Sequence, residues 1–132
     1  MGVVITPPGP GAVTVGSGAG ATPVQETPST PQSASAAVNN PVVLTINGIA
    51  GQTIRITALS SAYNSAPAGG GISVVVNGVT IFQGVINNSG LVGMPLPPGG
   101  LLCQAGQNAV ITLNNGGAAV SGAINAAFYY GQ

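Results

Sequence analysis

The stretch ISVVVNGVTIFQG (residues 72–84) contains the clearest structural signal in this chain of 132 residues. Two runs rich in β-branched residues flank the pair Asn77-Gly78, which readily adopts the positive φ angles that a type I′ turn requires. Residues 74–76 are therefore expected to pair with residues 79–81 in an antiparallel hairpin. No part of the chain shows the periodicity of a helix, so the hairpin predicts an all-β protein.

Before this hairpin, the stretches PVVLTI (41–46) and TIRITALSSAY (53–63) are rich in β-branched and other apolar residues. Alternation of apolar and polar side chains places successive residues on opposite faces of a strand. In the second stretch, Ile54 and Ile56 are expected on one face and Arg55 on the other. Both stretches are therefore predicted to be strands with one buried face.

After the hairpin, residues 84–102 are less regular, and their three prolines restrict any strand there to a sheet edge. A second hairpin is predicted from NAVITL (108–113), the turn NNGG (114–117) and a long last strand over 118–130. These segments give seven or eight strands, which must close into two packed sheets or a barrel. A jelly-roll-like β-sandwich is favoured over an immunoglobulin-like one, because the Cys, Trp and Cys of an immunoglobulin core are missing.

The chain before residue 41 has the composition of an extended N-terminal arm, rich in Gly, Pro and Ser. Its apolar area is too small to offset an ordering entropy of roughly 1–2 kcal/mol per residue. Two β-prone segments, 2–6 and 12–15, can add a strand to another molecule's sheet. We predict an arm over 1–40 and a β-sandwich domain over 41–132. The expected partner-binding residues of the arm are Val3, Val4, Ile5, Val13, Val15, Pro23 and Pro28.

Charged side chains are almost absent, because Arg55 is the only Lys or Arg and Glu26 the only Asp or Glu, and there is no His. Nucleic-acid binding needs a basic surface, so no nucleic-acid partner is expected. Acid–base and nucleophilic catalysis need tuned acids or bases, so we predict that the chain is not an enzyme. Metal sites use carboxylates, Cys or His, so no metal or cofactor is expected. No stretch approaches the ~20 apolar residues of a membrane helix, so no membrane partner is expected.

Binding through shape, backbone and neutral polar groups remains, and a surface with little charge does little to keep copies apart. Tyr63, Tyr129 and Tyr130 are candidate interface or ligand aromatics, able to stack on sugars; the alternative is that they fill the core. Cys103 is expected to be a small buried hydrophobe, with a reactive thiol as the alternative. Glu26 is a candidate to pair with a partner's cation.

Three stretches of the β domain, 51–86, MPLPPGGLL (94–102) and 106–130, resemble small β-sandwich structural proteins of tailed-bacteriophage virions. The shared pattern is a strand GQ-x-I-x-I-x-x-L-S-x-S/A-Y, then P-x-G-G-x-I/L-x-V, a PPGGL loop and a G-x-N-A-V-x-x-L hairpin. The resemblance does not extend to the arm. It implies a capsid decoration, or cement, protein on the outer surface of a phage head, from a family without catalytic or metal residues.

On this interpretation, the partners are the major capsid protein or other shell subunits, and the arm staples neighbouring subunits. A homo-oligomer is expected, with trimers on threefold positions favoured, because association covers apolar sheet faces. Two alternatives stay open. One is a carbohydrate-binding or host-adhesion module on a virion or cell surface, and the other is a self-assembling filament subunit whose arm completes the sheet of the next copy.

Overall fold

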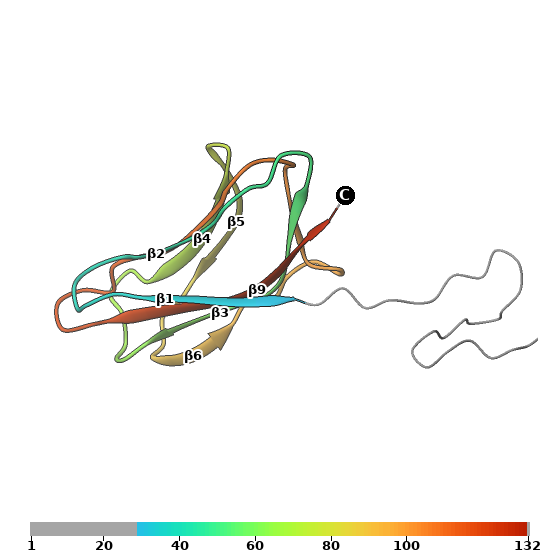
Figure 1. Cartoon of the computed structure of the whole chain (residues 1–132). Helices are drawn as coiled ribbons and strands as arrows, with labels where there is room; N and C mark the ends of the chain where they lie inside the picture. The colour runs from blue at the N-terminus through green and yellow to red at the C-terminus, as the bar shows by residue number, and fades with distance from the viewer. Residues whose placement is uncertain (1–28, 132) are drawn as a thin grey trace, which may run out of the picture.

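The computed structural model describes residues 29–131, which form two antiparallel sheets packed face to face (Figure 1). This part of the chain contains nine strands and no helix, and so no helix that could span a membrane. In chain order the strands are β1 (Thr30–Ser35), β2 (Val42–Ile46), β3 (Thr53–Tyr63), β4 (Gly71–Val76), β5 (Val79–Val85), β6 (Gly90–Gly93), β7 (Leu101–Cys103), β8 (Ala109–Leu113) and β9 (Gly122–Gly131).

The strand order is that of a jelly roll. Sheet A has the order β1-β9-β3-β6, with β7 also paired to β3, and sheet B has the order β2-β8-β4-β5. β6 pairs with residues 60–63 of β3 and β7 with residues 54–56, so these two short strands share one position at the edge of sheet A. Nine strands, two of which share a position, therefore fill eight positions. The predicted all-β jelly-roll sandwich is confirmed.

The hairpin of β4 and β5 forms as the sequence predicts. Asn77 and Gly78 have φ angles of 50° and 77°, both positive, as a type I′ turn requires. The register follows the prediction for the two pairs nearest the turn. Beyond them a bulge shifts the pairing by one residue, so that Val74 lies opposite Phe82 instead of Ile81.

The predicted second hairpin is wrong. β8 lies in sheet B between β2 and β4, whereas β9 lies in sheet A between β1 and β3. The turn after β8 therefore begins a crossing between the sheets. Glycines allow the close packing of this crossing, because a Cβ on Gly116 would lie 2.6 Å from Val120 Cγ1 and 2.9 Å from Tyr63 Cε1.

β1 lies inside the region that was predicted to be the arm. It pairs with β9 from Thr30 opposite Phe128 to Ser35 opposite Ala123. The folded unit therefore begins by residue 30, and the predicted boundary at residue 40 is wrong. The sequence TPQSAS has little apolar area, but an edge strand can be held by backbone hydrogen bonds to its single neighbour, and this pairing leaves no signal in the composition.

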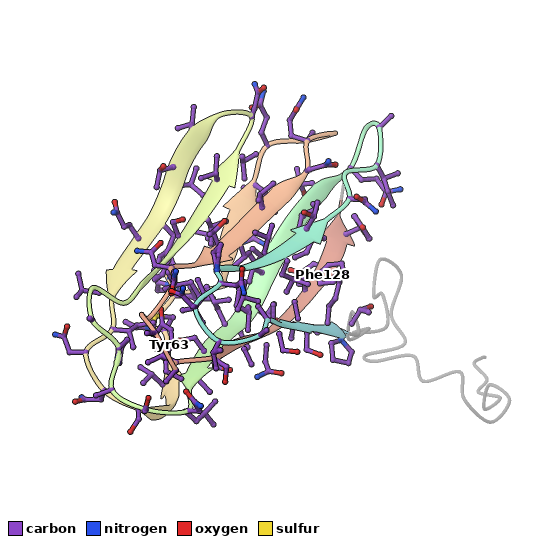
Figure 2. All side chains as sticks on the ribbon, turned by 90° about the vertical axis from the view of Figure 1, so that its left-hand side faces the viewer. Tyr63 and Phe128 are labelled. Carbon is purple, nitrogen blue, oxygen red and sulfur yellow. The ribbon has the colours of Figure 1, made fainter. Side chains whose placement is uncertain are left out.

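The core lies between the sheets and consists of the inward-facing residues of both (Figure 2). Ile54 and Ile56 are fully buried while Arg55 between them is not, as the alternation predicted. The bulge in β3 between Ile56 and Ala58 changes the alternation, so that Leu59 also points inward. The outer faces of the two sheets are left as the broad surfaces of the molecule.

Candidate interaction surface

The arm residues expected to bind a partner, from Val3 to Pro28, all lie outside the described residues. The candidate surface is therefore built from residues 29–131. Among these residues Arg55 is the one charged side chain, and no three side chains of the His, Cys, Asp or Glu type gather within this range.

Tyr63 is a core residue. Its side chain is 2% exposed, and its hydroxyl donates a hydrogen bond to the carbonyl oxygen of Asn114 at 2.6 Å. Burial raises the pKa of this phenol above its usual value of 10.0. Figure 2 shows the ring among the interior side chains. Of the two roles that the sequence left open, the structure supports the core role and not a ligand-stacking role for Tyr63.

Tyr130 and Tyr129 lie on opposite faces of β9 because they are adjacent in a strand. Tyr130 packs against the core, where its ring meets Phe128 edge to face with centroids 5.6 Å apart and planes at 89°. Its hydroxyl donates to the carbonyl oxygen of Asn47 at 2.7 Å. Tyr129 is half-buried and lies on the outer face of sheet A. Of the three predicted aromatics, Tyr129 alone belongs to a broad outer surface.

Cys103 is a small buried hydrophobe, as expected. It is 1% exposed, and burial raises the pKa of its thiol from 9.0 to about 11. Because the thiolate is the reactive form, this cysteine is held in its unreactive state at neutral pH.

A row of three paired residues crosses one end of the outer face of sheet A. Arg55 on β3 lies opposite both Tyr129 on β9 and Leu102 on β7. Directly paired residues project their side chains to the same face of a sheet, and Leu102 is 53% exposed. We call these three residues the Arg55 row. It combines a cation, a phenol ring and an aliphatic group.

The guanidinium of Arg55 holds the loop between β6 and β7. Its Nη1 donates to the carbonyl oxygen of Gly99 at 2.9 Å. The loop ends in a turn in which the amide of Gly100 donates to the carbonyl oxygen of Pro97 at 2.8 Å. Gly99 has a φ of 82°, which with Pro98 before it matches a type II turn. The PPGG sequence thus returns the chain to β3 at Arg55.

Gly100 allows this close return. Its φ is 93°, and a Cβ there would lie 2.5 Å from the carbonyl oxygen of Ile56. Because both the backbone conformation and the space exclude a side chain, this position requires glycine. The prolines of this loop predicted a sheet edge, but the contact with Arg55 could not be inferred from spacing.

A shallow hollow of about 580 Å³ lies where the edge of sheet A is interrupted between β6 and β7. Its floor is the bulged part of β3, and the half-buried Met94 and Leu96 contribute apolar side chains. At one end of the hollow, the amide of Met94 donates a hydrogen bond to the carbonyl oxygen of Leu59 at 2.8 Å, and this bond joins the chain after β6 to β3. The hollow adjoins the Arg55 row through Gly99. No pattern in the sequence identified Met94, Leu96 or Leu102 as surface groups.

The rest of the outer face of sheet A carries uncharged side chains, most of them small, with the exposed Leu91 as a larger apolar group. One paired row consists of Ser33, Asn125, Ser60 and Gly93, and the next consists of Ser35, Ala123, Ala62 and Leu91. The outer face of sheet B is also neutral, with the paired row Val43, Thr112, Ser73 and Gln83. Both surfaces can bind by shape, van der Waals contact and neutral hydrogen bonds.

No protein-family model matches the chain, and no curated protein is significantly similar to it. Among solved structures, the chain is similar to the CBM36-1 domain of a multidomain xylanase from the hindgut metagenome of Trinervitermes trinervoides. The two share 16% sequence identity over 73% of each chain, with a TM-score of 0.40. This likeness is too weak to bear on function.

Proposed function

We propose that this chain is a structural protein that binds other subunits of a large assembly, and specifically that it decorates the outer surface of a phage head. The observation that carries the proposal is the composition of the two outer sheet faces. Apart from Arg55, they present neutral side chains over both broad surfaces of residues 29–131, and these include exposed apolar groups such as Val43, Leu91 and Leu102. A surface of this kind opposes close contact with another protein very little, because few charges must be desolvated.

The chemistry of the described residues supports binding over catalysis. The two buried groups that could take part in proton transfer, Tyr63 and Cys103, both have raised pKa values and stay protonated at neutral pH. Arg55 has its guanidinium directed to a backbone carbonyl. What remains are neutral contacts, which suit a permanent neighbour in a shell. The specific assignment to a phage head rests on the motif resemblance of the β domain.

Purified heads of a phage that encodes the chain provide the direct test. The protein is expected to bind them in many copies and to stay bound in 1 M NaCl, because contacts without charges are not screened by salt. A deletion that ends before β1, removing residues 1–28, is expected to lower occupancy if the arm staples neighbouring subunits. Full-length protein that fails to bind heads, or that is released by moderate NaCl, would contradict the proposal.

The filament alternative is favoured by one observation, the edge of sheet B at β5, where no other strand of residues 29–131 pairs. β5 is an edge strand of seven residues that contains neither a proline nor a charged residue. Prolines and charged side chains are two features with which proteins usually protect an edge strand from pairing. Val79 and Val85 at its ends are 61% and 77% exposed. An extended segment of another copy can therefore add to this edge.

Light scattering of the purified protein separates the two functions. Fibres that grow without a second protein, and that are lost in a Val85→Lys variant, would support the filament and count against decoration. Val38→Lys is the matched control, since Val38 is also exposed, at 48%, but lies outside the strands. A protein that stays at one small size at all concentrations would exclude the filament.

A further inference from the structure

Three asparagines of the chain are followed directly by glycine, at residues 47–48, 77–78 and 115–116. In such a pair the backbone nitrogen of the glycine can attack the side-chain amide of the asparagine, because glycine has no Cβ to hinder the approach. The glycine nitrogen and the asparagine side chain must both be free to move together. The three pairs share this chemistry but differ in how the fold holds them.

The peptide unit between Asn47 and Gly48 is held at both ends. The amide of Gly48, which would be the nucleophile, donates to Oδ1 of Asn108 at 2.7 Å. The carbonyl oxygen of Asn47 accepts a hydrogen bond from the hydroxyl of Tyr130, also at 2.7 Å. This peptide unit cannot rotate for the attack without breaking both bonds.

The side chain of Asn115 is held by three hydrogen bonds. Its Nδ2 donates to the carbonyl oxygen and to Oδ1 of Asn39, both at 3.0 Å. Its Oδ1 accepts from the amide of Gly117 at 2.8 Å. The next residue, Gly116, is buried in the crossing between the sheets. The side-chain amide of Asn115 therefore cannot turn toward the nitrogen of Gly116 while these bonds persist.

Asn77 and Gly78 lie exposed at the tip of the β4–β5 hairpin (Figure 1). Within residues 29–131, the side chain of Asn77 makes a single hydrogen bond, from Nδ2 to Oε1 of Gln104 at 3.5 Å, a length at which such a bond is weak. The amide of Gly78 has no backbone acceptor in this range. A Cβ on Gly78 would meet no heavy atom within 4 Å, so the space around this nitrogen is open.

We propose that Asn77 is a site of spontaneous deamidation, whereas Asn47 and Asn115 are protected by their contacts. The nitrogen of Gly78 gives its proton to hydroxide and attacks Cγ of Asn77. The bond from Cγ to Nδ2 then breaks, and the side-chain nitrogen takes a proton from water and leaves as ammonia. A second water opens the resulting succinimide ring at either carbonyl, which gives aspartate or isoaspartate. The sum of these steps consumes one water and releases one ammonia, with no oxidation or reduction.

The product alters the turn that leads into the edge strand β5. Its carboxylate would be the first acidic side chain of residues 29–131, and charged side chains protect edge strands from pairing. Isoaspartate also adds a carbon to the main chain of a two-residue turn that sets the hairpin register. The modification would therefore oppose strand addition at β5. This inference does not depend on whether the protein decorates a shell.

Incubation of the native protein at pH 8 tests the proposal without any substitution. Each deamidation adds one negative charge to a chain of net charge zero, so isoelectric focusing follows the reaction, and mass spectrometry of peptides assigns the site. The same protein unfolded in urea calibrates the three sites. Relative to the unfolded protein, Asn47 and Asn115 are expected to react about tenfold or more slowly than Asn77 in the folded state, since hydrogen bonds must break first.

Two variants test the contacts themselves, after circular dichroism has shown that each is folded. Asn108→Ala frees the amide of Gly48, so it should accelerate deamidation of Asn47 by about three- to tenfold, the factor that one neutral hydrogen bond supplies. The rate at Asn77 should not change. Asn77→Gln keeps a side-chain amide but would need a larger ring to react, so it should abolish the first acidic species seen with the native protein.

Folded protein in which Asn47 or Asn115 reacts as fast as Asn77 would overturn the proposal, because the contacts would then give no protection. So would an Asn77 that reacts in urea but stays intact in the folded protein. A folded Asn108→Ala variant with no gain at Asn47 would show that the bond to Gly48 is not protective, and it would also overturn the proposal.

Discussion

The hydroxyl of Tyr63 donates a 2.6 Å hydrogen bond to the carbonyl oxygen of Asn114, and this bond joins the end of β3 in sheet A to the chain that leaves β8 in sheet B. Asn114 begins the crossing between the sheets, and its amide donates in turn to the carbonyl oxygen of Gly71 at 2.7 Å. The buried Tyr63 thus fixes the point at which the chain changes sheets.

Tyr63→Phe is expected to lower the free energy of unfolding by about 1 kcal/mol, because it removes a hydrogen bond from a part-buried place and leaves the carbonyl of Asn114 without this donor. Chemical denaturation followed by circular dichroism measures the change. Tyr129→Phe is the matched control, and it should change stability by less than about 0.5 kcal/mol, since Tyr129 lies on the outer face. Equal effects of the two substitutions would contradict this role of Tyr63.

Ser61→Ala is expected to raise the free energy of unfolding by about 0.5–1 kcal/mol, because a buried polar group without a partner opposes folding and alanine removes it with little change in volume. Ser61 is fully buried, and within the described residues its hydroxyl has no hydrogen-bond partner. Ser60→Ala, on the outer face, should have almost no effect. A loss of stability in Ser61→Ala, measured by the same denaturation, would indicate that the hydroxyl has a partner, such as a buried water.

Gly100→Ala is expected to lower the free energy of unfolding by about 2 kcal/mol or more, since it combines a positive φ with a clash against the backbone of Ile56. The control is Gly93→Ala in β6, where a Cβ would have no heavy atom within 4 Å. Thermal unfolding of both variants gives the comparison. If Gly100→Ala were as stable as Gly93→Ala, the tight return of the loop to β3 would be wrong.

Stability is expected to fall between about pH 9 and pH 11 because of Cys103. The folded thiol has a pKa of about 11 against its usual 9.0, so the unfolded chain loses this proton first as pH rises. The contribution of this thiol to the free energy of unfolding is fully present below pH 9. It is lost as the pH rises through 11, by roughly 2–3 kcal/mol in all. Tyr63 changes stability in the same direction at higher pH, since its pKa is also raised.

Denaturation at a series of pH values measures this decline, and Cys103→Ala is the control. This variant should be less stable than the native chain at pH 7, because a buried group is made smaller. Its stability should nevertheless depend less on pH between pH 9 and pH 11. The same steep decline in Cys103→Ala would assign the effect to another group.

Short-range signals in the sequence were sufficient for most of the strands and for one turn. The alternation around Ile54 and Ile56 placed β3, and Asn77-Gly78 placed the β4–β5 turn, because both signals act between neighbouring residues. The absence of helical periodicity and the number of strands then led to a sandwich. The burial of Cys103 followed from its ordinary behaviour as a small hydrophobe.

The candidate surface depended on contacts between residues far apart in the chain. Arg55 meets Gly99, and Ser29 meets Thr57, across 44 and 28 residues of sequence. Nothing in the local sequence at either end of these contacts specifies the other end. The Arg55 row and the hollow beside it were therefore visible only once β7 and β9 had been placed on either side of β3.

The sequence by itself determined that this chain is all-β, where most of its strands lie, and that its surface is nearly without charge, because these properties follow from local backbone preferences and composition. The tertiary structure alone decided that β8 and β9 belong to different sheets, that β1 joins the domain, and that Tyr63 is internal. Strand pairing explains the difference. Any strand with one apolar face can add to several edges, and the choice among them depends on how the side chains of the whole domain fill a common interior.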